Sequence, residues 1–416
     1  MINRVETRYH AKLDIVPCLY GFINLGIIMS RFTILSYPTQ SSSNLLSLTD
    51  SRSRYMLPIG GRFRVIDFTI RNSVSSNADS TLILNNHEDQ LQQYIDNYSS
   101  DSSEIKSHKI IVHSYNSSDI ESLLDILIGI DTSFFVLYNG DNPSIINLSD
   151  VFEKFKASKK RSLLIKLRIA GKPSMAYKVV ICEKKNIISL IKKVLKDKNR
   201  SFNFFELIIN SLIHSGINTT ILDAYYWPIN SLTDYYSLNR EIIWNKGISD
   251  LLVNEKIIQS KIKTNRFTLL DERCSVKNSS ISDHCYINGR VESSIIFPCV
   301  DIEEGAVVVD SIILPYVRIG AGARIRNSII DESTDENIGE DVRRFNIGRN
   351  CIIGSEEKYI KNNDFPNLLN SSITLIGKNN YIKDGVNIGS ACYVASNSSE
   401  EYFNMKSRLN DGESIM

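Results

Sequence analysis

The residues best suited to chemistry in the first half of the chain surround a Pro-Ile-Gly-Gly turn. Gly60 and Gly61 end this turn, and Arg62, Arg64 and Asp67 follow it closely. Guanidinium groups beside a glycine turn could bind a phosphate or a charged effector. The same side chains could equally form an ion-pair network that supports the turn. The residues alone leave both interpretations open, and neither makes these side chains catalytic.

Charge and cysteine content narrow the class of protein. The chain has 48 basic and 47 acidic side chains, so no net field attracts nucleic acid or an acidic membrane surface. Seven cysteines are dispersed without a Cys-x-x-Cys pair, which predicts free thiols in a reducing cytoplasm. A cluster of four lysines at a helix end is typical of a solvated face. These lysines are Lys192, Lys193, Lys196 and Lys198.

Alternating strands and helices are expected to position these residues. Apolar runs predict strands at 81–84, 109–113, 134–138, 163–167 and 177–182. Helices are predicted at 88–97, 119–129, 186–195, 203–214 and 233–252. A further apolar run, Leu19–Met29, is too short to span a bilayer and predicts a buried first strand. The alternation predicts an α/β domain whose mostly parallel sheet has helices on both faces.

The C-terminal third contains an internal repeat. Residues 291–307 align without gaps on residues 308–324, and Ser-Ile-Ile recurs at 294, 311 and 328. Within each unit apolar residues step by about six, which is typical of a hexapeptide β-helix. The pattern predicts a parallel β-solenoid from about Cys274 to Gly389. His284 is the only histidine in this region, and its repeat position indicates polar surface rather than an acyl-transfer base.

The stretch from Leu48 to Ser73 resembles the segment after the nucleotide loop in the bacterial glucose-1-phosphate adenylyltransferase (ADP-glucose pyrophosphorylase) family. The run from Tyr20 to Leu25 resembles the first strand of the GlgD-type, regulatory subunit of that enzyme. The resemblance implies a Rossmann-like nucleotidyltransferase α/β domain followed by a left-handed parallel β-helix. We therefore expect an N-terminal extension at 1–17, the α/β domain at 18–260, the β-helix at 261–395 and a tail at 396–416.

The resemblance also implies which parts a catalytic member needs. In such members ATP and glucose 1-phosphate react with Mg²⁺ to give ADP-glucose and pyrophosphate. The phosphates need a glycine-rich loop after the first strand, but no glycine lies between Gly26 and Leu48. Arg54 stands where catalytic members have a lysine, and Asp141 matches a metal-binding carboxylate. Pro228 stands where the second metal carboxylate belongs, so Asp141 is a doubtful metal ligand.

We expect a cytoplasmic subunit of glucose-1-phosphate adenylyltransferase that acts in glycogen synthesis with little or no activity alone. Arg54 and Asp141 are the only candidates for catalysis, and Gly60, Gly61, Arg62, Arg64 and Asp67 are candidates for substrate or effector binding. The expected partner is a catalytic subunit in a hetero- or homotetramer, with neither nucleic acid nor a membrane involved. Two alternatives remain: an active nucleotidyltransferase with a divergent site, and a non-enzymatic sensor of sugar phosphates or nucleotides.

Overall fold

The described part of the chain begins after the first 30 residues. The computed structural model describes residues 31–38, 42–87, 91–101, 108–114, 120–158, 162–169, 177–196, 204–214, 218–254, 267–333, 345–355 and 359–416. The extension at 1–17, the apolar run Leu19–Met29 and the boundary near residue 260 lie outside these ranges and stay predictions. Among the helices described, none combines the length and apolar character that a membrane span requires.

An eight-stranded, mostly parallel sheet forms the centre of the α/β domain, as predicted. Its strand order is β5-β4-β1-β6-β9-β8-β10-β7. The pairs β5–β4, β4–β1, β1–β6 and β8–β10 are parallel, whereas β9 and the short β7 run antiparallel to their neighbours. The strands are β1 (Phe32–Tyr37), β4 (Ser80–Asn85), β5 (Lys109–Ser114), β6 (Phe134–Asn139), β7 (Ser144–Ile145), β8 (Ser162–Ile169), β9 (Tyr177–Glu183) and β10 (Asn218–Tyr226).

The first described strand lies where no strand was predicted. The strand between β4 and β6 is β1, Phe32–Tyr37. Phe32, Ile34 and Leu35 are buried, because both faces of the parallel sheet are covered and side chains that point to either face meet apolar neighbours.

Helices cover both faces of the sheet. On one face β1, β4 and β6 pack with α4 (Ile120–Gly129), α6 (Lys184–Lys196) and α7 (Phe204–His214). On the other face β1 and β6 pack with α5 (Leu148–Ser158). A further cluster joins α1 (Val65–Val74) to α2 (Leu91–Asp101). Each predicted helix is present, and the stretch predicted as one helix at 233–252 forms two, α8 (Leu232–Trp244) and α9 (Lys246–Asn254).

A short irregular segment between β1 and α1 connects the sheet to the solenoid. It contains the 3₁₀ helices η1 (Ser42–Thr49) and η2 (Arg54–Met56), then the hairpin of β2 (Pro58–Ile59) and β3 (Phe63–Arg64). One apolar cluster includes η1, α8 and solenoid strands together. The α/β domain and the solenoid therefore share a continuous buried contact within the unit from Arg31 to Met416.

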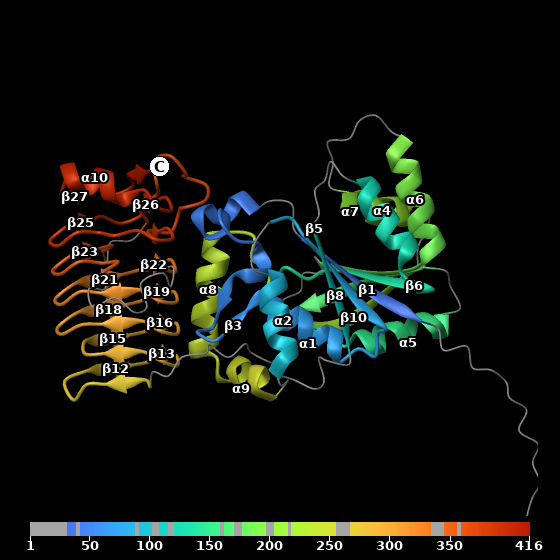
Figure 1. Cartoon of the computed structure of the whole chain (residues 1–416), viewed down its shortest axis with the longest axis horizontal. Helices are drawn as coiled ribbons and strands as arrows, with labels where there is room; N and C mark the ends of the chain where they lie inside the picture. Colours follow the sequence, from blue (N-terminus) through green and yellow to red (C-terminus); the bar gives the residue numbers. More distant parts are fainter. Residues whose placement is uncertain are drawn as a thin grey trace, which may run out of the picture. The chain divides into compact units, whose positions relative to one another are not determined.

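The predicted solenoid is present as three parallel ladders, and its strands stack in coil order (Figure 1). The 17-residue period is confirmed, since Ile295 pairs with Ile312 and Ile312 with Ile329. The first ladder is β11 (Leu269–Leu270), β14 (Tyr286–Ile287), β17 (Asp301–Ile302) and β20 (Arg318–Ile319). The second is β12 (Ser275–Lys277), β15 (Arg290–Glu292), β18 (Val307–Val309), β21 (Arg324–Arg326), β23 (Ile352–Ile353), β25 (Asn387–Ile388) and β27 (Arg408–Leu409). The third is β13 (Ser280–Ile281), β16 (Ile295–Ile296), β19 (Ile312–Ile313), β22 (Ser328–Ile330), β24 (Thr374–Ile376), β26 (Tyr393–Val394) and β28 (Ser414–Ile415).

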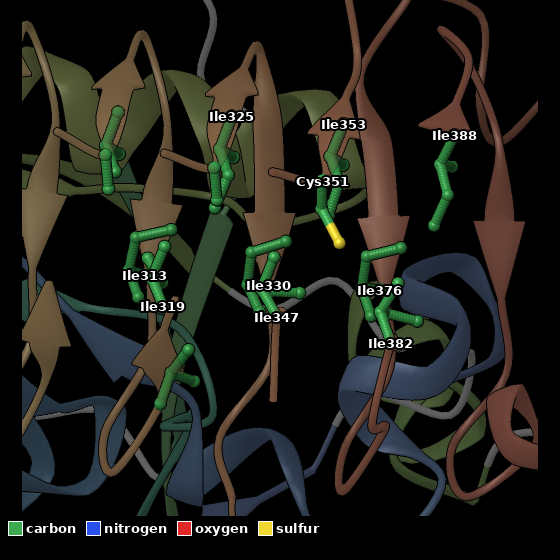
Figure 2. Close-up of a cluster of buried hydrophobic side chains, with 14 of the residues drawn as sticks. Ile313, Ile319, Ile325, Ile330, Ile347, Cys351, Ile353, Ile376, Ile382 and Ile388 are labelled. Atoms are coloured by element: carbon green, nitrogen blue, oxygen red, sulfur yellow. The ribbon is translucent and has the colours of Figure 1, made fainter. Parts of the chain in front are cut away.

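Columns of isoleucine fill the interior of the solenoid. Figure 2 shows three such columns side by side, one from each face. They comprise Ile313, Ile330 and Ile376; Ile325, Ile353 and Ile388; and Ile319, Ile347 and Ile382. Every one of these side chains is buried, so each coil is stabilised by the coil above and the coil below it.

Residues 396–416 were predicted to form a tail, but these last 21 residues are part of the solenoid. They form α10 (Ser399–Met405) and the strands β27 and β28, which pair with β25 and β26. Phe403, Leu409 and Ile415 enter the solenoid core. The sequence prediction ended the solenoid too early because α10 interrupts the hexapeptide spacing.

Candidate functional site

The carboxyl ends of β1 and β6 meet at the centre of the sheet, where the order of strand connections reverses. From β1 the chain proceeds to β4 and β5 on one side and returns to β6 on the other. Ligands of open α/β sheets bind at such a switch point, outside the carboxyl ends of the strands. Asp141 and Asn142 lie just after β6, and both are buried. This position is the candidate functional site.

Arg54 and Asp141, the two predicted candidates for catalysis, are ion-paired with each other. Arg54 Nε lies 3.2 Å from Asp141 Oδ2, and the two side chains are 3% and 0% exposed. Arg54 Nη2 donates to Asn142 Oδ1 at 3.0 Å and to the carbonyl of Ile229 at 2.5 Å. A buried carboxylate requires a counter-charge, and Arg54 supplies it from within the protein.

The resemblance places the second metal carboxylate at the position of Pro228. The segment around Pro228 lies beside Asp141. The amide of Ile229 donates to Asn142 Oδ1 at 2.8 Å, and the carbonyl of Ile229 accepts from Arg54. The two predicted metal positions are therefore neighbours in space, but the second offers Pro228 and backbone groups instead of a carboxylate.

These residues do not fit Mg²⁺. The ion requires near-octahedral oxygen ligation at about 2.0–2.1 Å, usually with one or two carboxylates. The one carboxylate at the site, Asp141, has the guanidinium of Arg54 against it. Across the described ranges, no three His, Cys, Asp or Glu side chains come together in a way that could hold a metal ion.

Two buried tyrosines and a glycine pack closely around this ion pair. The Tyr55 hydroxyl and Ser36 Oγ lie 2.8 Å apart. Burial, followed by the charge of Asp141, raises the pKa of Tyr55 well above its usual range, and burial raises the pKa of Tyr138 to about 12. Both phenols are thus neutral near pH 7. A Cβ on Gly140 would lie 2.0 Å from Ser36 Oγ, so only glycine fits this turn, which follows β6 and lies against β1.

The Gly60–Gly61 turn, a predicted binding element, is held between α8 and the solenoid. Both glycines have positive φ, +62° and +81°, which other residues adopt with strain. The amide of Gly60 donates to Asn239 Oδ1 at 2.8 Å, and Ser282 Oγ donates to the carbonyl of Gly61. The turn serves as a contact between the two domains.

Arg64 and Asp67 support the start of α1, which favours the second of the two interpretations offered by the sequence. Asp67 Oδ2 accepts from the amide of Arg64 at 2.7 Å, and Asp67 Oδ1 accepts from the Tyr94 hydroxyl at 2.9 Å. Arg64 Nη1 donates to the carbonyl of Met56 at 2.5 Å. These contacts satisfy the helix N-terminus. Arg62 is exposed.

Arg52, which the sequence did not indicate as a functional or contact residue, lies at the domain contact. Its guanidinium is ion-paired with Asp331 of the solenoid, and its Nη1 lies 2.9 Å from Glu332 Oε1. Glu332 also receives Arg64 Nη2 at 3.5 Å and Lys378 Nζ at 3.3 Å. We call these five residues the interdomain charge cluster.

Burial and charge act against each other within the interdomain charge cluster. Burial alone would lower the pKa of Arg52, but Asp331 and Glu332 outweigh it and raise that pKa. Burial would raise the pKa of Glu332, but Arg52, Arg64 and Lys378 lower it to about 2. Burial raises the pKa of Asp331 despite Arg52. Arg52 and Glu332 are therefore charged near neutral pH.

The solenoid repeat contained a signal for this cluster. The third Ser-Ile-Ile unit continues with Asp331 and Glu332, where the second continues with Leu314 and Pro315 and the first has Phe297. A carboxylate at a position that is apolar and buried in two neighbouring coils requires a cation from elsewhere. The repeat departs from its own pattern at the point where Arg52 contacts it.

The other residues considered in the sequence are His284, the cysteines and the lysine cluster. His284 is half-buried at φ +66°, at the same turn position as Cys299 and Tyr316 of the following coils. The six described cysteines are free thiols, as predicted. Three lysines of the predicted basic face are exposed on α6, and Lys198 lies outside the described residues. The exposed lysines are Lys192, Lys193 and Lys196.

Two comparisons relate the chain to known proteins. A family model described as GlmU-like, C-terminal hexapeptide matches residues 263–353. A glucose-1-phosphate adenylyltransferase of Acetivibrio thermocellus is 23% identical over 390 residues, which cover 83% of this chain and 89% of that protein. The hexapeptide match and the three parallel ladders together confirm the predicted fold class, an α/β domain followed by a left-handed β-helix.

Proposed function

We propose that the chain is a GlgD-type regulatory subunit of a glucose-1-phosphate adenylyltransferase. The similarity to the Acetivibrio thermocellus protein covers most of both chains and supports a nucleotidyltransferase of glycogen synthesis. The finer assignment, a subunit with little or no activity alone, rests on the residues of the candidate site. Its cellular location is proposed to be the cytoplasm, in keeping with free thiols.

The observation that carries the proposal is the buried pair of Arg54 and Asp141. Nucleotidyl transfer depends on positioning the phosphates and neutralising their charge with cations. Here the carboxylate that would hold a metal ion faces a guanidinium 3.2 Å away, and the opposite segment presents Pro228. The site is therefore neutralised by its own side chains and has little capacity left to bind a metal–nucleotide complex.

The segment after β1 provides a second argument. A phosphate cradle of backbone amides requires glycines, because only glycine allows the backbone to close around an anion. No glycine occurs between β1 and η1, nor within η1, which contacts the solenoid instead. We infer that this segment, which holds nucleotide phosphates in catalytic members, supports the domain contact in this chain.

Purified protein assayed alone tests the loss of activity. With ATP, glucose 1-phosphate and Mg²⁺, we expect pyrophosphate release at least about 100-fold below the ~1–10 s⁻¹ usual for enzymes. Asp141→Asn is the matched variant, and it should leave this low rate unchanged. Release at ~1 s⁻¹ or faster that disappears in Asp141→Asn would instead favour an active enzyme with a divergent site.

Co-expression with a catalytic glucose-1-phosphate adenylyltransferase subunit of the same organism tests the proposed partner. We expect the two chains to elute together at about the size of a tetramer, and the effector response of the mixture to differ from that of the catalytic chain. Elution of this chain only as a monomer, with no change in the catalytic chain's kinetics, contradicts the proposal.

A further inference from the structure

The guanidinium of Arg54 is surrounded by the kind of oxygen atoms that a hard divalent cation takes as ligands. They are a carboxylate oxygen of Asp141, the carboxamide oxygen of Asn142 and the backbone carbonyl of Ile229. Carboxylate, amide and carbonyl oxygens are the usual protein ligands of Mg²⁺, Mn²⁺ and Ca²⁺. These three oxygens come from two chain segments far apart in sequence and converge on one cation, which here belongs to the protein.

The fit of Arg54 to these oxygens is incomplete. Its Nε and Nη1 are buried, and neither makes a hydrogen bond of normal geometry to any of the described residues. A guanidinium has five N–H donors in a fixed plane, so a site shaped for it would offer matching acceptors in that plane. The three oxygens lie near Nε and Nη2 only, and among the described residues Nη1 has no acceptor.

We propose that Arg54 is a built-in cation that replaces a divalent metal ion at Asp141. Its Nη2 lies 2.5–3.0 Å from two of the three oxygens, so a metal at a bonding distance of about 2.0–2.6 Å would collide with it. Removing the guanidinium leaves the same oxygens around a vacated, negatively charged position. The inference goes beyond the proposed function, because it concerns this chain alone and holds whether or not it has a partner.

The test measures binding of Mn²⁺ to the purified full chain by calorimetry and by the loss of the free-ion paramagnetic signal. The wild-type chain should show no saturable binding up to about 1 mM, the weak end of protein cation sites. Arg54→Ala should bind one Mn²⁺ at least about 10-fold more tightly than the wild type. Arg54→Ala combined with Asp141→Asn should lose this binding. Arg62→Ala, which removes an exposed arginine of the same segment, should behave as the wild type.

Thermal unfolding gives an independent readout. Arg54→Ala should melt at a lower temperature than the wild type, and about 1 mM Mn²⁺ should raise that temperature only while Asp141 is present. Arg54→Gln serves as a second variant of closer shape.

The outcomes separate clearly. The proposal is overturned if the wild type binds Mn²⁺ in a manner that depends on Asp141. It is also overturned if neither Arg54 variant binds Mn²⁺. Failure of both variants to fold even with Mn²⁺ present would also count against it, because the metal should replace the lost charge. Pyrophosphate release plays no part in these measurements, so they are independent of the test of the proposed function.

Discussion

Replacement of Arg52 by methionine tests whether the α/β domain and the solenoid are joined through a buried ion pair. Methionine keeps the length and apolar stem of the side chain and removes only its charge and hydrogen bonds. The Arg52 side chain is 4% exposed and that of Asp331 is 0% exposed, so neither charge is screened by water. The substitution leaves Asp331 buried without its cation.

The size of the effect follows from the partners that remain. Breaking a buried ion pair from one side costs about 3–5 kcal/mol of the free energy of unfolding. Glu332 keeps Arg64 and Lys378 within 3.5 Å, so the loss should come mainly from Asp331. Burial already raises the pKa of Asp331, and its protonation would relieve the unpaired charge. The loss should therefore be larger at pH 7 than at pH 5.

Urea unfolding followed by tryptophan fluorescence and far-ultraviolet circular dichroism measures this loss. Both tryptophans, Trp227 and Trp244, lie in the α/β domain, so fluorescence follows that domain while circular dichroism follows the whole chain. Arg273→Met is the matched control, because its ion pair with Glu304 has both side chains about 60% exposed. That change should cost less than about 1 kcal/mol.

A compensating variant makes the reasoning refutable. Arg52→Met combined with Asp331→Leu gives the third repeat unit the leucine that Leu314 supplies in the second. Replacing a buried ion pair by apolar residues is often neutral or stabilising, so the double variant should recover to within about 1 kcal/mol of the wild type. A loss below about 1 kcal/mol for Arg52→Met, or no recovery in the double variant, would refute the structural role of this pair.

Three further predictions use other parts of the molecule. Arg52 and its neighbours hold the pKa of Glu332 at about 2 despite burial; the stability it contributes is complete above pH 4.5 and is lost between pH 4.5 and 2. The difference in unfolding free energy between wild type and Glu332→Gln should therefore shrink by on the order of 3 kcal/mol over that range. Gly61→Ala should cost at least about 1 kcal/mol more than Gly305→Ala in thermal unfolding, since both have positive φ but only Gly61 would place its Cβ 3.0 Å from another side chain. Iodoacetamide at pH 7.5 should modify the half-buried Cys274 but not the native Cys182, whose pKa is raised by burial, as mass spectrometry of the peptides would show.

The solenoid and most of the sheet were predictable because their patterns are local. A 17-residue period places one isoleucine per hexad in the core, and no distant residue is needed to infer it. The apolar runs of β4, β6 and β9 likewise indicate a buried parallel sheet. The pattern failed where it was interrupted: α10 concealed the last coil, and the short strand Phe32–Tyr37 was not predicted.

The candidate site was predictable in its residue types but not in its geometry. Arg54 and Pro228 were identified as departures from the pattern of a catalytic member and Asp141 as a match to it, each at its own place in the sequence. Only the tertiary structure brings them together, because the segment before α1 and the turns after β6 and β10 meet beside the carboxyl ends of the strands. That meeting shows that the arginine neutralises the aspartate.

By itself, the sequence determined the two architectures, their order and the absence of glycines where a phosphate cradle would lie. The tertiary structure decided the roles of the charged residues. Arg52 looks like an ordinary basic residue in sequence. Its partner Asp331 lies 279 positions further along the chain, and only the packing of the two domains brings the pair together. Local sequence patterns indicate which side chains are buried. The partner of a buried charge can lie on a distant chain segment, and no local pattern identifies that segment.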